Sequence, residues 1–261
     1  MGKLIVLEGL DGSGKSTQLA LLEAALKKRN ISFKTVSFPE YDLPSCAPVK
    51  MYLAGEFGKK PNDVNAYAAS LFYAVDRFAS LKKNWGEFYE NGGIILAGRY
   101  TTSNAIHQTS KLDESNWAEY LDWLQDLEYN KVGIPKPDKV IYLNVPVEVS
   151  QGLLSSRYDG DEAKKDIHER DVNYLLHCHK AAEFAKARFE WDSVECYENG
   201  VMRSRESIAD EILSIVLPEA SASRTAFFPS IFIISPLYLK SHLIYRLVQI
   251  NISIQARPHK L

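Results

Sequence analysis

The sequence has little cysteine, no excess of basic charge and no long apolar run at its start. Three cysteines among 261 residues, Cys46, Cys178 and Cys196, fit neither a disulfide framework nor a Cys/His metal site. The formal net charge of -2 gives no basic field that would attract polymeric nucleic acid. Glu8 and Asp11 interrupt the first apolar stretch too early for a signal peptide. We therefore expect a cytoplasmic protein with neither a nucleic-acid polymer nor a membrane as partner.

Acidic residues are missing from the end of the chain, 220–261, where five basic residues occur. The apolar run at 227–248 is too broken by prolines and charged residues for a transmembrane helix, which needs about 20 apolar residues. The composition predicts a domain over 1–217 and an appended basic and apolar tail over 218–261, poorly ordered. Packing of the tail on the domain, contact with a membrane surface and a reading-frame change in the coding sequence are the alternatives.

Short apolar runs alternate with segments of helical periodicity over the first 217 residues. The runs lie at 3–7, 33–38, 94–98 and 139–145 and are rich in Ile, Val and Leu. This alternation predicts a three-layer α/β fold with a central parallel sheet wrapped by helices. The segment 148–196 reads as helical, with one charged interruption at 157–166 that is typical of a mobile loop. A last helix is predicted over 205–217, ending at Pro218.

The segment GLDGSGKS, Gly9 to Ser16, matches G-x-x-x-x-G-K-[ST] between a predicted strand and a predicted helix. The pattern indicates a P-loop, in which backbone N–H groups cradle phosphates, Lys15 reaches the β and γ oxygens and the Ser16 hydroxyl binds Mg²⁺. A glycine-rich turn with an incidental lysine is the alternative. The predicted ATP contacts are Gly9, Leu10, Asp11, Gly12, Ser13, Gly14, Lys15, Ser16 and Thr17.

A P-loop alone does not distinguish kinases, GTPases and motor ATPases. A GTPase is disfavoured because the N-K-x-D motif is missing: the segment at 130–133 reads NKVG. The aspartate that would accept from the guanine ring is therefore lacking there.

Four segments in order resemble thymidylate kinase over about residues 1–217. They are LEGLDGSGKST at 7–17, FPEY at 38–41, LFYAVDR at 71–77 and GRYTTSNAIHQ at 98–108. The resemblance implies the P-loop NTPase fold with a helical lid over about 156–170. It also implies phosphorylation of dTMP to dTDP with ATP and Mg²⁺, and a homodimer.

The resemblance implies roles on the acceptor side for residues before the third strand. Asp11 would meet the sugar 3'-hydroxyl, and Phe38 and Tyr41 would lie along the acceptor nucleotide. Tyr73 and Arg77, four residues apart on one helix face, would stack on and bind the base. Phe72 is the alternative stacking ring. In a purely structural alternative, the aromatic residues belong to the core and Arg77 forms a surface ion pair with an acid.

The segment after the third strand carries the remaining acceptor contacts. Arg99 would bind the acceptor phosphate with its planar fork of donors. Tyr100 would lie near the sugar 2' carbon, while Ser103 and Asn104 would face the base. The predicted catalytic residues are Lys15, Arg99 and the lid residue Arg157; the further lid cations Lys164, Lys165 and Arg170 are explained almost equally well by an exposed charged helix surface.

Two positions depart from the family pattern. Gly98 stands where an aspartate usually precedes the arginine, and Glu40 stands where arginine is often found. We expect Gly98 to lower kcat more than nucleotide affinity, since the missing acid lies by the metal and the phosphates. The alternatives are a catalytically weakened pseudo-kinase and a kinase for another pyrimidine nucleotide or a nucleoside. Arg77 and Arg99 favour an acceptor that already carries a phosphate.

Overall fold

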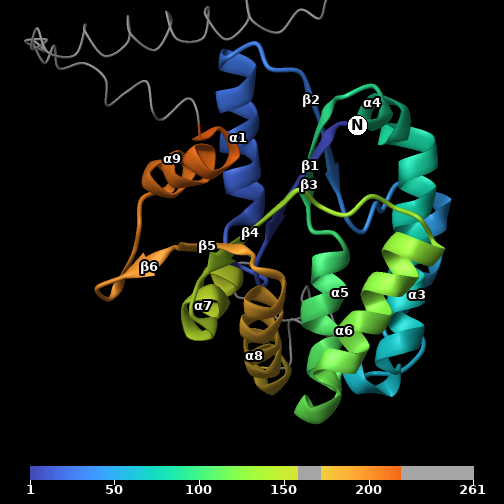
Figure 1. Ribbon diagram of the computed structural model, residues 1–261. Helices are drawn as coiled ribbons and strands as arrows, with labels where there is room; N and C mark the ends of the chain where they lie inside the picture. Colours follow the sequence, from blue (N-terminus) through green and yellow to red (C-terminus); the bar gives the residue numbers. More distant parts are fainter. Residues whose placement is uncertain (158–171, 219–261) are drawn as a thin grey trace, which may run out of the picture. The chain divides into compact units, whose positions relative to one another are not determined.

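The structure is a computed structural model that describes residues 1–157 and 172–218. A five-stranded parallel sheet lies at its centre, in the order β2-β3-β1-β4-β5 (Figure 1). Its strands are β1 (Lys3–Glu8), β2 (Phe33–Ser37), β3 (Ile94–Gly98), β4 (Lys139–Asn144) and β5 (Asp192–Glu195). A short antiparallel pair, β6 (Tyr197–Glu198) and β7 (Val201–Met202), follows β5.

Helices connect the strands. The α-helices are α1 (Lys15–Lys28), α2 (Ala47–Leu53), α3 (Ala66–Ser80), α4 (Gly86–Glu90), α5 (Thr101–His107), α6 (Trp117–Gln125), α7 (Val147–Arg157), α8 (Val172–Phe189) and α9 (Arg205–Val216). Short 3-10 turns are η1 (Pro44–Cys46), η2 (Pro61–Asp63), η4 (Thr109–Lys111) and η5 (Glu114–Asn116), and π-helical turns are η3 (Leu81–Trp85) and η6 (Asp126–Lys131).

Alternation along β1 divides the core into two layers. Ile5 and Leu7 pack in a cluster with residues of α1 and α9, whereas Leu4 and Val6 pack in a second cluster with η3 and α4. Figure 1 shows α1 and α9 on one side of the sheet and α3, α4 and α6 on the other. Both faces of the parallel sheet are therefore covered, as such sheets require. The predicted three-layer α/β fold is confirmed.

The predicted helix up to Cys196 is wrong at its end, because β5 occupies Asp192–Glu195. β5 contains a single apolar residue, the buried Val194, and pairs with β4 alone at the edge of the sheet. An edge strand of this composition lacks the apolar run that marks the central strands, so periodicity does not reveal it.

Residues Met1–Pro218 form one compact unit. The predicted lid over about 156–170 lies outside the described residues except at its first two positions, and the tail after Pro218 lies outside them entirely. The domain boundary, the lid and the tail therefore stay predictions. None of the helices in residues 1–157 and 172–218 has the length and apolar content to cross a membrane.

Candidate active site

The phosphate loop joins β1 to α1 and depends on glycines with a left-handed backbone. Gly12 has φ 83°, and Gly14, at the N-cap of α1, has φ 89°. A Cβ at Gly12 would lie 2.3 Å from the carbonyl oxygen of Ser150 on α7, so a side chain does not fit there. Among described residues nothing lies within 4 Å of the Cβ position of Gly14, and the buried Ser13 hydroxyl has no hydrogen-bond partner. The loop leaves room for phosphate oxygens at the α1 N-terminus.

Lys15 is the first residue of α1, and its ammonium group folds over the loop. Nζ donates to the carbonyl oxygens of Gly9 at 2.7 Å and Leu10 at 2.8 Å. These contacts hold a positive charge beside the space where the loop receives phosphates. The arrangement suits the predicted contact of Lys15 with β and γ oxygens.

β1 and β3 bring Glu8 and Arg99 together at the carboxyl edge of the sheet. The parallel register matches Leu7 with Gly98, so Glu8, the last residue of β1, and Arg99, the first residue after β3, lie at the same level. Arg99 has φ 66°, and its backbone N–H donates to the Leu7 carbonyl oxygen at 3.2 Å. Left-handed backbone in a non-glycine residue is uncommon and is concentrated at functional sites.

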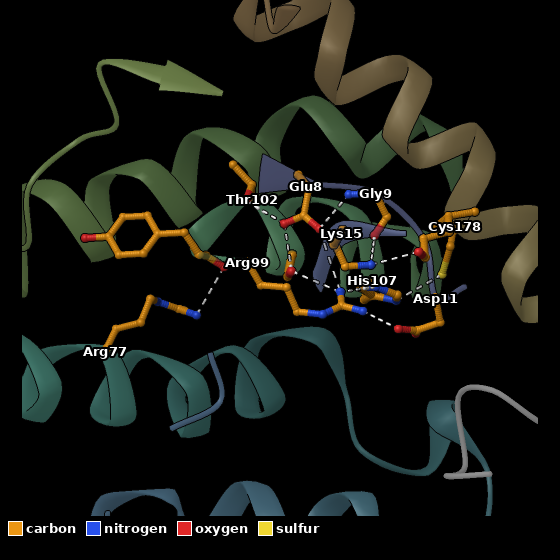
Figure 2. A network of polar contacts seen from close by, with 12 residues as sticks. Glu8, Gly9, Asp11, Lys15, Arg77, Arg99, Thr102, His107 and Cys178 are labelled. Atoms are coloured by element: carbon orange, nitrogen blue, oxygen red, sulfur yellow. Dashed lines mark hydrogen bonds and ion pairs between the residues drawn. The ribbon is translucent and has the colours of Figure 1, made fainter. Parts of the chain in front are cut away.

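The Arg99 guanidinium contacts four side chains at this edge (Figure 2). Nη2 pairs with Oδ1 of Asp11. Nη1 lies 3.3 Å from Oγ of Ser103, 3.4 Å from Nε2 of His107 and 3.7 Å from Oε1 of Glu8. The Arg99 side chain remains 19% exposed, so an anion can still reach it.

A neutral histidine lies behind Arg99. Burial, followed by the charge of Arg99, lowers the pKa of His107 to about 4. Because a guanidinium only donates, Nε2 accepts from Arg99, which assigns the ring hydrogen to Nδ1. Nδ1 faces Sγ of the buried Cys178 at 3.5 Å. His107 lies in the segment at 98–108 that carries the family resemblance, but the sequence alone predicts no role for it.

Arg77 lies in a buried ion pair with Glu128. The exposed fractions are 1% for Arg77 and 0% for Glu128. Nε and Nη2 of Arg77 contact the Glu128 carboxylate, and Nη1 donates to the Tyr100 carbonyl oxygen at 3.4 Å. Burial acts to lower the pKa of Arg77, but Glu128 outweighs it and raises the value. Arg77 thus pairs with an acid, as the alternative interpretation expects, but the pair is buried and not on the surface. The contact of Arg77 with the acceptor stays a prediction.

Tyr100 and Phe38 lie in the core. Their exposed fractions are 0% and 3%, and their ring centroids are 5.7 Å apart. The Tyr100 hydroxyl donates to the carbonyl oxygen of Pro135 at 3.0 Å. Buried rings present no surface to a ligand, so this arrangement gives no support to their predicted contacts with the acceptor. Tyr41, in contrast, is exposed.

The other predicted acceptor residues come from α3 and α5. Tyr73 is half-buried and meets the ring of Tyr52 at 6.5 Å, nearly at a right angle. Asn104 is buried and donates to a main-chain oxygen of α3 at 3.4 Å. Asp76, beside Arg77, accepts from the backbone N–H of Glu40 at 2.8 Å, which holds the segment after β2 against α3.

Gly98 is the last residue of β3. A Cβ there would lie 3.3 Å from Cδ2 of Leu19 on α1 and 3.4 Å from Oγ of Ser37. Both are side-chain atoms, so a side chain at position 98 fits after small shifts and would point toward α1. The first turn of α1 carries the exposed residues Ser16 and Thr17.

No group of three or more His, Cys, Asp or Glu able to hold a metal occurs in the described part of the chain. Mg²⁺ with a nucleotide needs few protein ligands, because phosphate oxygens and water supply most of them. The exposed hydroxyl of Ser16 fits that requirement. Arg157 is the last residue of α7, but its side chain and the other lid cations lie outside the described residues.

Known proteins resemble the chain in both sequence and fold. A family model described as thymidylate kinase matches residues 7–191. Thymidylate kinase of Mycobacterium tuberculosis (strain H37Rv) is 31% identical over 171 residues, covering 65% of this chain and 78% of the relative. That of Caenorhabditis elegans is 32% identical over 153 residues, covering 57% and 66%.

A solved structure of thymidylate kinase from Candida albicans superposes with a TM-score of 0.62 at 20% identity, covering 84% of this chain and 92% of that one. This likeness shows the fold. The family match begins at β1 and ends just before β5, so it contains the phosphate loop, Arg99 and the whole network around Glu8. The chain belongs to the thymidylate kinase family.

Proposed function

We propose that this chain transfers the γ-phosphate of ATP to dTMP, producing ADP and dTDP. The observation that carries the proposal is the meeting of a phosphate loop with Arg99 at one edge of the sheet. Lys15 faces the donor phosphates there, and Arg99 is a second cation suited to an acceptor phosphate. Two cations at the same edge of the sheet suit transfer between two phosphate groups.

Phosphoryl transfer between nucleotides depends on alignment and charge neutralisation more than on proton abstraction. In the proposed reaction Arg99 exchanges its contact with Asp11 for the acceptor phosphate, which it binds through two parallel N–H donors. The Asp11 carboxylate then accepts from the sugar 3'-hydroxyl. One ion pair of the free protein thereby becomes two contacts with the substrate.

Mg²⁺ is part of the proposal. Ser16 at the start of α1 would hold it together with phosphate oxygens. When bound, the ion neutralises phosphate charge and orients the oxygens. Gly98 leaves this ion without the carboxylate that the family pattern places next to the arginine.

The acceptor base is proposed to lie between α3 and α5. Tyr73 offers a half-buried ring for stacking, and the Asn104 amide lies on the facing helix. Arg77 lies behind these residues in its pair with Glu128 and is proposed to hold the wall of the base pocket.

We propose a homodimer that forms through α3. Four large apolar side chains on this helix are between 39% and 55% exposed: Tyr67, Leu71, Val75 and Phe78. Their spacing of four, four and three residues places them along one stripe of the helix. An exposed apolar stripe of this size is typical of a surface that a partner covers.

We place the protein in the cytoplasm. All three cysteines are free and buried. Thiols that stay reduced are usual in that compartment.

The proposal is tested by ADP release in a coupled assay with ATP and Mg²⁺. The acceptors are dTMP, dUMP, UMP, CMP and thymidine, and Lys15→Ala is the matched inactive control. We expect turnover with dTMP well above that with the other acceptors and its loss in the control. Turnover confined to UMP or CMP would show that one of these nucleotides, and not dTMP, is the acceptor. Nucleotide binding without turnover would indicate a pseudo-kinase.

A further inference from the structure

Glu8 is a fully buried carboxylate that accepts from three donors, one in the phosphate loop and two on α5. Oε1 accepts from the backbone N–H of Gly9 at 3.0 Å. Oε2 accepts from Oγ1 of Thr102 at 2.7 Å and from Oγ of Ser103 at 2.8 Å. Its exposed fraction is 0%. A buried charge is costly without such donors, so the surroundings of Glu8 are built to keep a carboxylate at this position.

Glu8 reaches Arg99 by two routes. The direct route is the ion pair of 3.7 Å between Oε1 and Nη1. The second passes through Ser103, whose hydroxyl accepts from Nη1 of Arg99 at 3.3 Å and donates to Glu8. Figure 2 shows Glu8 and Asp11 on different sides of the Arg99 guanidinium.

The two acids beside Arg99, Asp11 and Glu8, differ in their exposure to solvent. Asp11 lies in the phosphate loop and is 21% exposed, whereas Glu8 is enclosed at the end of β1. When an acceptor phosphate replaces Asp11, Glu8 is the carboxylate that stays against Arg99. This matters because Arg99 has a left-handed backbone, which persists only where the surroundings hold it.

We propose that Glu8 is a positioning residue: through its contacts with Gly9, Ser103 and Arg99 it fixes the phosphate-binding arginine relative to the phosphate loop. The inference deepens the proposed function and rests on it. Glu8 does not touch the substrate in this scheme, so its effect passes through Arg99. Its loss therefore weakens the binding of ligands that carry a 5'-phosphate and spares ligands that lack one.

The experiment compares the binding of dTMP and thymidine by calorimetry in the full-length wild type and in Glu8→Gln. Glutamine keeps the size of the side chain, and the hydroxyls of Thr102 and Ser103 can turn to accept from its amide. The charge facing Arg99 is removed, and the acceptor at Oε2 is replaced by a donor. We expect dTMP affinity to fall about tenfold and thymidine affinity to change less than about twofold. In turnover assays of Glu8→Gln, we expect KM for dTMP to rise and KM for ATP to remain unchanged.

A matched pair of threonine variants guards against a folding defect in Glu8→Gln. Thr102→Val removes a hydroxyl that Glu8 accepts from, whereas Thr101→Val removes a neighbouring hydroxyl that contacts Tyr129 instead. We expect a loss of dTMP affinity in Thr102→Val of about threefold and none in Thr101→Val.

The outcomes separate the inference from the proposed function. A wild type that does not prefer dTMP to thymidine overturns the proposed function and the inference with it. A wild-type preference that Glu8→Gln retains overturns the inference alone. Equal losses for both ligands in Glu8→Gln and in Thr102→Val show a purely structural role, which also overturns it.

Discussion

At the residue scale, two arginines meet carboxylates in different surroundings. Arg77 and Glu128 are both fully enclosed, so the donors of Arg77 are committed to a partner that it cannot leave without exposing a buried charge. Arg99 retains 19% exposure, and one of its acids, Asp11, is also partly exposed. Exchange of partners is therefore possible at Arg99 and costly at Arg77. This difference favours Arg99 over Arg77 as the residue proposed to bind the acceptor phosphate.

His107 links the stability of the protein to pH. Its pKa is lowered to about 4 by burial and by Arg99, whereas the unfolded chain takes up the proton near pH 6.5. The unfolded state thus binds more protons between these values, and the free energy of unfolding falls as pH decreases from 6.5 toward 4. Between pH 8 and pH 5 this contribution amounts to about 2 kcal/mol.

We expect His107→Gln to lose this part of the pH dependence. Urea unfolding at pH 8 and pH 5 measures it: the free energy of unfolding should change less between the two pH values in the variant than in the wild type. His177→Gln is the control, since His177 is exposed on α8. If the free energy of unfolding of His107→Gln depended on pH as strongly as that of the wild type, the buried neutral imidazole would be contradicted.

Gly98→Asp is expected to raise kcat about tenfold and to change both KM values less than about twofold. The reason is that a side chain at this position points toward α1, where Ser16 is proposed to hold Mg²⁺, and a carboxylate there acts mainly on the charge of the transition state. Initial rates at saturating ATP and dTMP measure the change. Gly98→Ala adds the Cβ alone as control; a gain in Gly98→Ala equal to that in Gly98→Asp would refute the metal role.

At the scale of elements, α3 has a buried polar face and an exposed apolar one. Its buried face carries Asp76 and Arg77, which fix the segment after β2 and the turn η6. Its exposed face carries the apolar stripe that includes Leu71 and Val75. An apolar stripe left in water is unfavourable, so its burial between two copies would supply the driving force for the proposed dimer.

Val75→Arg is expected to convert the dimer to a monomer, because it places a charge at the centre of the stripe. Sedimentation velocity measures the mass against 29.5 kDa for one chain. Ala20→Arg, on the exposed surface of α1, is the control and should leave the mass unchanged. A wild type that sediments as a monomer at micromolar concentration would refute the proposed homodimer.

How far the sequence predicts the molecule also depends on the element. The central strands β1, β3 and β4 are evident because both faces of a covered parallel strand are apolar. The edge strand β2 is predicted as well, although only Val36 is buried in it, whereas the polar edge strand β5 is missed. The phosphate loop is contiguous in sequence and is therefore recognised. Glu8 and His107 reach Arg99 only through the register of β1 with β3 and the turn of α5. An acid at the end of an apolar strand is a signal that could have identified Glu8.

At the scale of the whole molecule, the unit Met1–Pro218 encloses its core with its own elements. α9 covers one face of the sheet, where Ile208 and Ile212 are buried against α1. Chain termination at Pro218 leaves this layer intact, whereas termination at Ser204 removes it. Each of the two isoleucines contributes about 1.5–3 kcal/mol by burial, a large part of a typical domain's stability.

We therefore expect a chain ending at Pro218 to keep the fold and the kinase activity of the full chain. Thermal unfolding should agree within about 2 °C, since a change of 1 kcal/mol would shift Tm by roughly 2–4 °C at this size. A chain ending at Ser204 should unfold at a much lower temperature, because the apolar face of α1 then meets water. If the chain ending at Pro218 lost its cooperative transition or its turnover, residues 219–261 would be shown to be part of the working enzyme, and the composition break after Glu219 would not mark the end of the domain.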